Sequence, residues 1–526
     1  MTTTIAVLAR ALTYATLFCG LLLVFVPVRV LTTAGVTGPA SFGALQVAGV
    51  IVAAAGATLA DWCLPQPDLE RWLIAVVEIR SGAQAGQYFV PLTVALEDAD
   101  EARYRRLLPA AIARVRQHAA TGVLADAAAD EDFCRLIIDA IGQGRELATP
   151  LGRMRCAPSS AFAELRAAHP GELPIIPAGP QGANTTVRIG TAFFLKLFRR
   201  LDSASNLGVE VARYLTEVAH FPNTVPFAGV IEYQPNDGAA CTLAMLQGFV
   251  SNQGDGFDYT VNHLVRFLEE RVTQPAAPAD SHGLYLALVR TLATRTAQLH
   301  GVLAAAVDAA LAPAPITAAD LEEWRSSAHS ALAAALKLLE ERTAQLAPRA
   351  AATAAAVLAR RAVLLRSVAA GHSAVPRGLK IRCHGHYHLR QVLLRRNDFI
   401  ITDVGAADQS VAAQRRRCSP LFDVAGMLRS FAYAGRMALQ QCSLIAGDER
   451  ERWEPQLDAW EEQARAAFLT AYTEGTRGSG LFEPPDAAAL LRLFELEVAC
   501  ADLQRMLLAR PDWAGVPLRK LAALAE

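Results

Sequence analysis

The residues of this chain that could do chemistry gather in two segments, and Ile381 to Gly405 is the richer one. It reads IRCHGHYHLRQVLLRRNDFIITDVG, which predicts a polar loop followed by two short strands joined by a polar turn. Polar groups then lie at both ends of this hairpin. Gln391 offers an amide oxygen and Asp403 a carboxylate, and phosphoryl-transfer sites use these two kinds of ligand for magnesium.

The second segment joins a lysine on a strand to a glutamate on a helix. TTVRIG and TAFFLKLF predict two strands that meet at Gly190, and Lys196 lies in the second. The helix NLGVEVARYLTEVAH follows, with Glu210 near its start. Kinase-like folds use such a pair to hold the α- and β-phosphates of ATP. A solvated lysine at a strand edge is the alternative, and this segment alone leaves both open.

Three histidines alternate in the first segment. In an extended strand His384, His386 and His388 would share one face and could bind zinc. No fourth ligand is evident in the sequence. The alternative is that all three lie in a loop.

Composition excludes several classes of protein. The 526 residues allow three or four folded units, and 52 % hydrophobic with 19 % charged residues excludes disorder as the dominant state. Fifty basic against fifty-one acidic side chains provide no global field for nucleic acid, so no nucleic-acid partner is expected. Nine scattered cysteines without a CxxC pair favour a reducing compartment.

The N-terminal region predicts a membrane anchor. Residues 11–28 are uncharged and reach about 27 Å as a helix, and residues 42–60 form a second uncharged run after a GPAS turn. Two transmembrane helices through residues 11–60 are expected. The alternatives are buried helices of a soluble domain and a cleaved signal peptide, and the single Arg10 before the first run disfavours the latter. The stretch weakly resembles the opening helices of isoprenylcysteine carboxyl methyltransferase-like membrane proteins. Their cofactor-binding segment is not recognisable here, so no methyltransferase activity is expected.

The segments between anchor and hairpin predict a mixed α and β protein. Residues 72–97 predict two strands around the turn SGAQAG, and residues 101–120 predict a helix. Residues 169–184 are rich in turn formers and predict a boundary near Gly182. Beyond residue 260 the pattern is helical almost throughout, apart from the island at 378–403.

Five motifs together resemble the maltokinase family, including kinase domains fused to trehalose synthases. They are ANTTVRIGTAFFLKLFRRLDSASNLGVEVARYLTE, LQGFVSNQGDGFDYT, RTAQLHGVLA, IRCHGHYHLRQVLL and RRRCSPLFDVAGMLRSFAYA. The resemblance covers roughly residues 85–510. It implies an α+β, bilobal protein-kinase-like fold of the aminoglycoside phosphotransferase type with an N-terminal cap. It also implies ATP and Mg²⁺ as cofactors and transfer of the γ-phosphate to maltose in α-glucan metabolism.

The resemblance assigns a role to each matching residue. It implies that Lys196 and Glu210 hold the phosphates, and that Gln391 and Asp403 bind magnesium. The other residues that it places at the site are Asn184 and Thr185 over the nucleotide, Gln247 to Val250 at the adenine hinge, and His384 with Asp423 as structural supports of the catalytic loop.

The chain departs from the family pattern at three places. The family loop HGDYHLGQ reads HGHYHLRQ here, so His386 stands at the position of the catalytic aspartate and Arg390 replaces a glycine. The family's FEGEP after the metal aspartate reads VGAAD, so both glutamates are lost. The start of the cap, Arg71 and Trp72, is followed by Leu73, and we expect a shortened cap.

We therefore predict a membrane hairpin at 1–64, a cap at 65–182, a nucleotide-binding N-lobe at 183–255 and a helical C-lobe at 256–526. The predicted protein is a multi-pass cell-membrane protein whose kinase region faces the cytoplasm and phosphorylates maltose or a related α-glucoside. A trehalose synthase or another α-glucan enzyme is a possible partner. The alternative is a membrane-anchored pseudokinase that binds nucleotide and regulates or scaffolds such an enzyme.

Overall fold

The structure is a computed structural model that describes residues 57–65, 71–81, 84–117, 119–181, 184–201, 206–274, 282–370, 375–405, 416–447 and 449–525. Most of the predicted membrane hairpin lies outside these residues. Within the described part of the chain, no helix is long and apolar enough to cross a membrane.

The predicted end of the second membrane helix at Ala60 is wrong. Residues Ala57–Cys63 form strand β1, which pairs antiparallel with β2 (Trp72–Ser81). An uncharged run fits a strand as well as a helix, and pairing with a neighbouring strand decides between them. The sheet therefore starts before residue 64.

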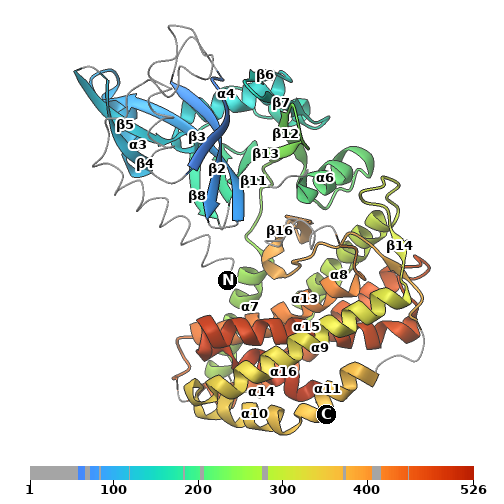
Figure 1. The fold of residues 1–526 in the computed structure, drawn as a ribbon. Coiled ribbons are helices and arrows are strands. Elements are labelled where there is room, and N and C mark those ends of the chain that lie inside the picture. Colours follow the sequence, from blue (N-terminus) through green and yellow to red (C-terminus); the bar gives the residue numbers. More distant parts are fainter. Residues whose placement is uncertain are drawn as a thin grey trace. The chain divides into compact units, whose positions relative to one another are not determined.

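The chain divides into two units, each described here by itself. We call the first the sheet unit; it contains the described residues up to Val218 together with Val225–Val250. We call the second the helical unit; it contains Ala219–Thr224 and the described residues from Ser251 onward. In Figure 1 the sheet unit runs from blue to green and the helical unit mostly from yellow to red.

One sheet of the sheet unit takes β2 to β5 from the predicted cap at 65–182, and β1 and β11 from outside it. Its antiparallel strand order is β1-β2-β3-β5-β4, and β11 (Arg200–Leu201) adds to β3. The other strands are β3 (Gln84–Leu96), β4 (Ala111–Gln117) and β5 (Ala120–Asp126). The β2–β3 hairpin confirms the two strands predicted in residues 72–97.

The helix predicted over 101–120 is wrong in its second half. Helix α3 (Glu101–Leu107) passes into a short 3-10 turn (Leu108–Ala110), and β4 follows. Pro109 in that turn cannot continue an α-helix, and the β-branched residues after it pair with β5 instead.

The second sheet of this unit carries the strand lysine. Its order is β6-β7-β12-β13-β10-β9-β8. The strands are β6 (Glu146–Thr149), β7 (Gly152–Pro158), β8 (Ile175–Gln181), β9 (Asn184–Ile189), β10 (Phe193–Phe198), β12 (Phe227–Pro235) and β13 (Cys241–Gly248). The β9–β10 pair confirms the predicted strands. The sequence predicts turns over residues 169–184, but residues 175–181 form the strand β8. Prolines in this segment argue against a strand in the sequence, and pairing with β9 forms one nevertheless.

Three helices accompany these strands: α4 (Glu131–Gly142), α5 (Phe162–Ala167) and α6 (Leu207–Arg213). A five-residue π-helix (Tyr214–Val218) continues α6. Phe133 of α4 is fully buried with Leu195 of β10 in one apolar cluster. That cluster fixes β10, and with it the position of its lysine.

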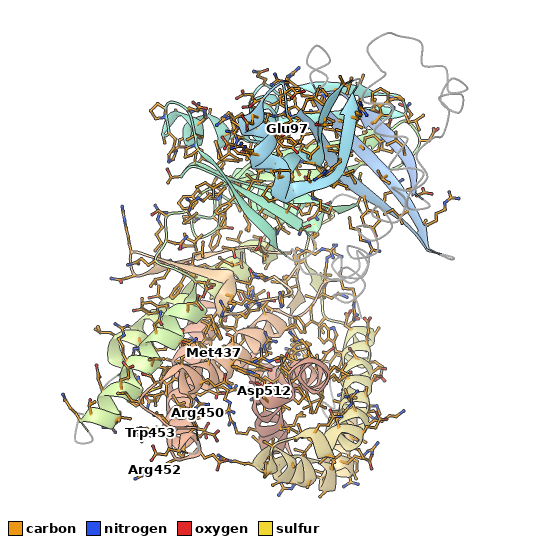
Figure 2. All side chains as sticks on the ribbon, turned by 90° about the vertical axis from the view of Figure 1, so that its left-hand side faces the viewer. Glu97, Met437, Arg450, Arg452, Trp453 and Asp512 are labelled. Carbon is orange, nitrogen blue, oxygen red and sulfur yellow. The ribbon has the colours of Figure 1, made fainter. Side chains whose placement is uncertain are left out.

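The helical unit confirms the predicted helical pattern beyond residue 260. It contains α7 (Gly256–Thr273), α8 (Gly283–Ala304), α9 (Ala318–Arg342), α10 (Pro348–Ala359), α11 (Arg361–Ala370), α13 (Leu421–Gln441), α14 (Arg450–Gly475), α15 (Pro484–Ala509) and α16 (Gly515–Leu524). Asp255 caps α7 by accepting from the backbone N–H of Asp258. Figure 2 shows the side chains, with Met437 of α13 and Trp453 of α14 labelled among these helices.

Short strands interrupt the helices of this unit. β14 (Ala314–Pro315) pairs with β15 (Leu379–Lys380). The predicted hairpin is confirmed as β16 (Val392–Arg395) and β17 (Asp398–Ile401), joined through Arg396 and Asn397 at φ 50° and 63°. Positive φ at both central residues is what a tight two-residue hairpin turn requires.

Candidate active site

Asp423 on α13 holds the start of the loop at 384–391. Its Oδ2 accepts from the backbone N–H of His384 at 2.7 Å, and its Oδ1 accepts from that of Gly385 at 2.9 Å. His300 of α8 lies 3.2 Å from Oδ2 through Nε2, and its Nδ1 lies 2.8 Å from the Tyr472 hydroxyl. This buried chain of contacts fixes the loop to α13 and, through His300 and Tyr472, to α8 and α14.

The Asp423 carboxyl group is ionised despite its burial. Burial raises its pKa, but the hydrogen bond and charge of His300 and the backbone hydrogen bond from Gly385 outweigh burial, so the pKa is below its usual range. Hydrogen bonds to an ionised acceptor are stronger than neutral ones. The loop is therefore held by charge-assisted bonds.

His384 is a buried, neutral imidazole. It is 1 % exposed, and neither ring nitrogen makes a hydrogen bond of ordinary geometry. Burial lowers its pKa, and the nearby charges of Asp423 and Asp403 oppose that shift without reversing it. Its ring packs 5.0 Å from that of Tyr387, so His384 supports the loop from within.

Thr402 links the two predicted metal ligands, because it directly precedes Asp403 in the chain and is hydrogen-bonded to Gln391. Its backbone N–H donates to the Gln391 carbonyl at 2.9 Å, and its hydroxyl donates to Gln391 Oε1 at 3.0 Å. Gly405 N–H donates to the His384 carbonyl at 3.2 Å. The structure thus brings Gln391, Asp403 and the loop to one end of the β16–β17 hairpin. Sequence reasoning missed Thr402, although its place directly before Asp403 was a usable signal.

Asp403 has an unusual backbone conformation. Its φ is 53°, in the left-handed region that a non-glycine residue enters at a cost of about 1 kcal/mol. Aspartate tolerates this region better than most residues. The chain reverses at this position directly after β17.

The residues present fit a magnesium ion shared with phosphate. Gln391 Oε1 accepts one hydrogen bond and keeps a second lone pair, and Asp403 supplies a carboxylate. In the described residues no group of three or more His, Cys, Asp or Glu side chains could hold a metal by itself. Magnesium commonly keeps waters and completes its shell with substrate phosphates, which suits a site with two protein ligands.

The zinc site predicted at His384, His386 and His388 required these residues to lie in a strand. The residues from His384 to His388 form no strand, so the three rings do not share a strand face. The rings of His386 and His388 meet edge to face at 4.5 Å. Nδ1 of His388 accepts from the backbone N–H of Arg390 at 3.2 Å, which directs this ring into the loop itself.

Arg390 ties the exposed side of the loop to α7. Its guanidinium lies 3.2 Å from carboxylate oxygens of both Asp255 and Asp258, and 4.3 Å from the ring centroid of Phe257. Arg390 stands where the family pattern has a glycine, and the carboxylates of Asp255 and Asp258 balance its positive charge. The side chain of His386 is exposed.

Lys196 lies on an interior strand of its sheet, not on an edge strand. On β10 it is opposite Thr186 of β9 and Met245 of β13. Glu210 lies on α6 in the same unit. The ion pair between Lys196 and Glu210 stays a prediction.

Asn184 and Thr185 are the first two residues of β9 rather than part of a loop. Their register opposite β8 explains the difference, since β8 was not predicted. The Thr185 hydroxyl accepts from Nε of Arg199 at 2.9 Å.

Gln247 and Val250 lie where the chain leaves the sheet unit. Gln247 is near the end of β13, opposite Phe194 and Phe227. The helical unit takes over after Val250. The predicted site residues therefore divide between the two units, and their meeting at one nucleotide stays a prediction.

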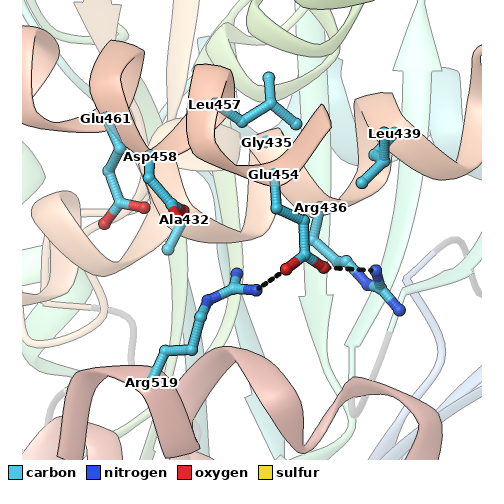
Figure 3. A pocket seen from close by; sticks show the side chains of 9 residues that line it. All are labelled: Ala432, Gly435, Arg436, Leu439, Glu454, Leu457, Asp458, Glu461 and Arg519. Carbon is cyan, nitrogen blue, oxygen red and sulfur yellow. Dashed lines mark hydrogen bonds and ion pairs between the residues drawn. The ribbon is translucent and has the colours of Figure 1, made fainter. Parts of the chain in front are cut away.

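A separate pocket lies among α13, α14 and α16 (Figure 3). Glu454 lies there 3.4 Å from both Arg436 and Arg519, and 2.6 Å from Arg349 of α10. Burial raises the pKa of nearby Glu461 to about 7. None of the predicted site residues lines this pocket, so it is not part of the candidate active site.

Comparison with known proteins identifies the fold. No protein-family model matches the chain. A glucosamine kinase solved in complex with glucosamine, ADP and inorganic phosphate is similar, with a TM-score of 0.60, 19 % identity, and coverage of 89 % of this chain and 93 % of that one. A second crystal form gives a TM-score of 0.57 at 18 % identity, with the same coverage. The protein therefore has an α+β kinase-like fold, as predicted.

Proposed function

We propose that this protein is an ATP-dependent phosphotransferase that acts on a sugar hydroxyl, with His386 at the position of the general base. The observation that carries the proposal is the pair of hydrogen bonds from Thr402 to Gln391. They place Gln391 beside Asp403, next to the loop that Asp423 holds. A kinase needs this combination of an amide oxygen, a carboxylate and a fixed loop.

The chain's own residues divide the work. Asp423 fixes the backbone on the N-terminal side of His386, whose exposed imidazole can accept the proton of an acceptor hydroxyl. A general base contributes about 10² to 10⁴-fold to the rate. Lys196 would neutralise phosphate charge. Bound magnesium would add charge neutralisation between the phosphates.

The acceptor is a sugar in this proposal, with maltose as the first candidate. The maltose assignment rests on the maltokinase-like motifs, and feeding of α-glucan metabolism rests on the same resemblance. The solved proteins of similar fold are described as glucosamine kinases, one of them with bound glucosamine. Both sugars offer hydroxyls to an exposed base and belong in one acceptor panel.

The pseudokinase alternative draws on one specific observation. The base position carries the imidazole of His386 instead of a carboxylate. Arg390 of the same loop forms ion pairs with Asp255 and Asp258. In this alternative the chain binds nucleotide without transferring phosphate and tunes an α-glucan enzyme. Nucleotide affinity without sugar phosphate formation would support it.

The proposal is tested by following ADP and sugar phosphate from Mg²⁺-ATP with maltose or glucosamine. Asp403→Asn should reduce the rate by about 10²-fold or more, because a metal ligand loses its charge. Lys196→Ala should weaken ATP binding. Asp458→Asn removes an exposed acid on α14 and is the matched control that should leave the rate unchanged. Full activity of Asp403→Asn would contradict the proposal.

We also propose that residues 11–56, which precede β1, anchor the protein to the cytoplasmic side of the cell membrane. The uncharged runs support this. Since β1 begins at Ala57 and pairs with β2, a test deletion should remove residues 1–56 and spare the strand. The full chain should sediment with membranes and the deletion variant should not. A full chain in the soluble fraction would contradict the anchor.

A further inference from the structure

Two cysteines flank the loop of the candidate active site on adjacent backbone segments. Cys383 directly precedes His384, and Cys418 lies five residues before Asp423. The segments form an antiparallel bridge, in which Ile381 N–H donates to the Cys418 carbonyl at 2.9 Å and Cys418 N–H donates to the Ile381 carbonyl at 3.0 Å. Cys383 is therefore the diagonal neighbour of Cys418 across this bridge.

The sulfur of Cys383 already points at the opposite segment. Its Sγ lies 3.4 Å from the carbonyl oxygen of Cys418 and 3.5 Å from that of Ser419. A disulfide needs α-carbons about 4.4–6.8 Å apart, and diagonal neighbours on paired segments lie about 7–8 Å apart on the same face, so the two segments must move slightly closer when the bond forms.

Accessibility separates this pair from the other cysteines. Cys383 and Cys418 are half-buried, and the other cysteines of the described residues are buried. A thiol must be reached by its oxidant in order to react. Among the described cysteines, a small oxidant thus meets this pair before the buried ones.

We propose that Cys383 and Cys418 are a modification site at which a low-molecular-weight disulfide, such as oxidised glutathione, forms an intramolecular disulfide. One thiolate attacks the small disulfide and releases one small thiol, and the other cysteine then attacks the mixed disulfide and releases the second. The two cysteines lose two protons and two electrons in total, and the small disulfide takes up both. The oxidant is thereby reduced to two thiols.

The reaction is slow at neutral pH and faster in base. Burial raises the pKa of the Cys383 thiol, so little of it is thiolate at neutral pH. The expected rate increases as the pH rises.

The disulfide acts on the candidate active site, and this consequence rests on the proposed function. Cys383 Sγ must turn from the two carbonyls that it now contacts and bind covalently to the segment leading to α13. The residue next to it donates the 2.7 Å hydrogen bond to Asp423. A shift there disturbs the loop that carries His386. We expect phosphate transfer to be about fivefold slower, because weakening one hydrogen bond to a charged group costs about 1 kcal/mol.

The test incubates the full chain with oxidised glutathione, blocks the remaining thiols and maps the peptides by mass spectrometry. The expected result is a peptide pair linked through Cys383 and Cys418, lighter than the two reduced peptides together by two hydrogens, and separated again by dithiothreitol. Cys383→Ser and Cys418→Ser should each abolish the linked pair. Cys383→Ser should instead keep glutathione on Cys418. Absence of the linked pair after oxidation at pH 8 would overturn the proposal.

Activity is measured on the same samples. Oxidation should slow the wild type about fivefold, dithiothreitol should restore it, and both serine variants should be insensitive. Unchanged activity of a fully linked protein would overturn the effect on the site. If the chain transfers no phosphate at all, the proposed function fails, and the peptide map still decides whether the disulfide forms.

Discussion

The buried side and the exposed side of the loop at 384–391 differ sharply. On the buried side, Asp423 bonds two backbone N–H groups and His300, and His384 is 1 % exposed. On the exposed side, His386 replaces the expected carboxylate and Arg390 replaces a glycine. The departures from the family pattern within this loop therefore fall where side chains meet solvent.

The two sides differ in how much a substitution lowers the free energy of unfolding. Removing one partner of a buried, hydrogen-bonded charge is strongly destabilising, whereas an exposed substitution commonly changes stability by less than about 0.5 kcal/mol. The scaffold that holds the loop can thus be intact while the group that it presents has changed. The buried side fixes where the loop lies, and the exposed side chain of His386 determines which proton transfer the loop can perform.

The largest effect is expected on the buried side. Asp423→Ala should lower the free energy of unfolding by about 3–5 kcal/mol, because it leaves the N–H groups of His384 and Gly385 without their acceptor. Asp423→Asn keeps one carbonyl acceptor and should cost less. Urea denaturation measures both. A loss below about 1 kcal/mol in the alanine variant would show that the two sides do not differ in this way.

An intermediate effect is expected at half-buried His388, and it depends on pH. Burial lowers its pKa to about 3, with the charges of His386 and Arg429 adding to the shift. Since the unfolded chain takes up this proton near pH 6.5, stability is full above that pH and falls as the pH decreases towards 3. His388→Asn should remove about 1–2 kcal/mol of the loss between pH 6.5 and 4.5, a figure discounted for partial exposure.

Urea denaturation at a series of pH values follows this change. The variant and the wild type should differ in slope below pH 6.5 and run parallel above it. Equal slopes over the whole range would contradict the buried, neutral state of His388.

The smallest effect is expected at Arg390. Arg390→Ala removes exposed ion pairs to Asp255 and Asp258 and a contact with the Phe257 ring, together worth about 1 kcal/mol or less. The difference should shrink in high salt, because exposed charges are screened. Arg390→Lys is the matched control that keeps the charge. A loss as large as that of Asp423→Ala would erase the distinction between the two sides.

Much of the fold was predictable where pattern and turn chemistry agree. The hairpin β16–β17 follows from two short apolar runs around RRND, and β9–β10 follows from two runs around Gly190. β4 and β8 were missed because a proline precedes or interrupts each, and only pairing with β5 and β9 reveals them as strands. Local pattern does not contain those long-range partners.

The candidate site was predictable in part. Gln391 and Asp403 were chosen for their ligand chemistry, and their juxtaposition through Thr402 agrees with that choice. The bonds from Asp423 to two backbone N–H groups could not be derived from residue types, because they join an α13 side chain to a distant loop. The resemblance to a family supplied that role.

The role of His386 as the base is decided by the rate of sugar phosphate formation in the wild type, His386→Ala and His386→Asp. We expect measurable wild-type turnover, a loss of about 10² to 10⁴-fold in the alanine variant, and activity in the aspartate variant. An inactive wild type beside an active His386→Asp protein would contradict the claim that His386 serves as the base.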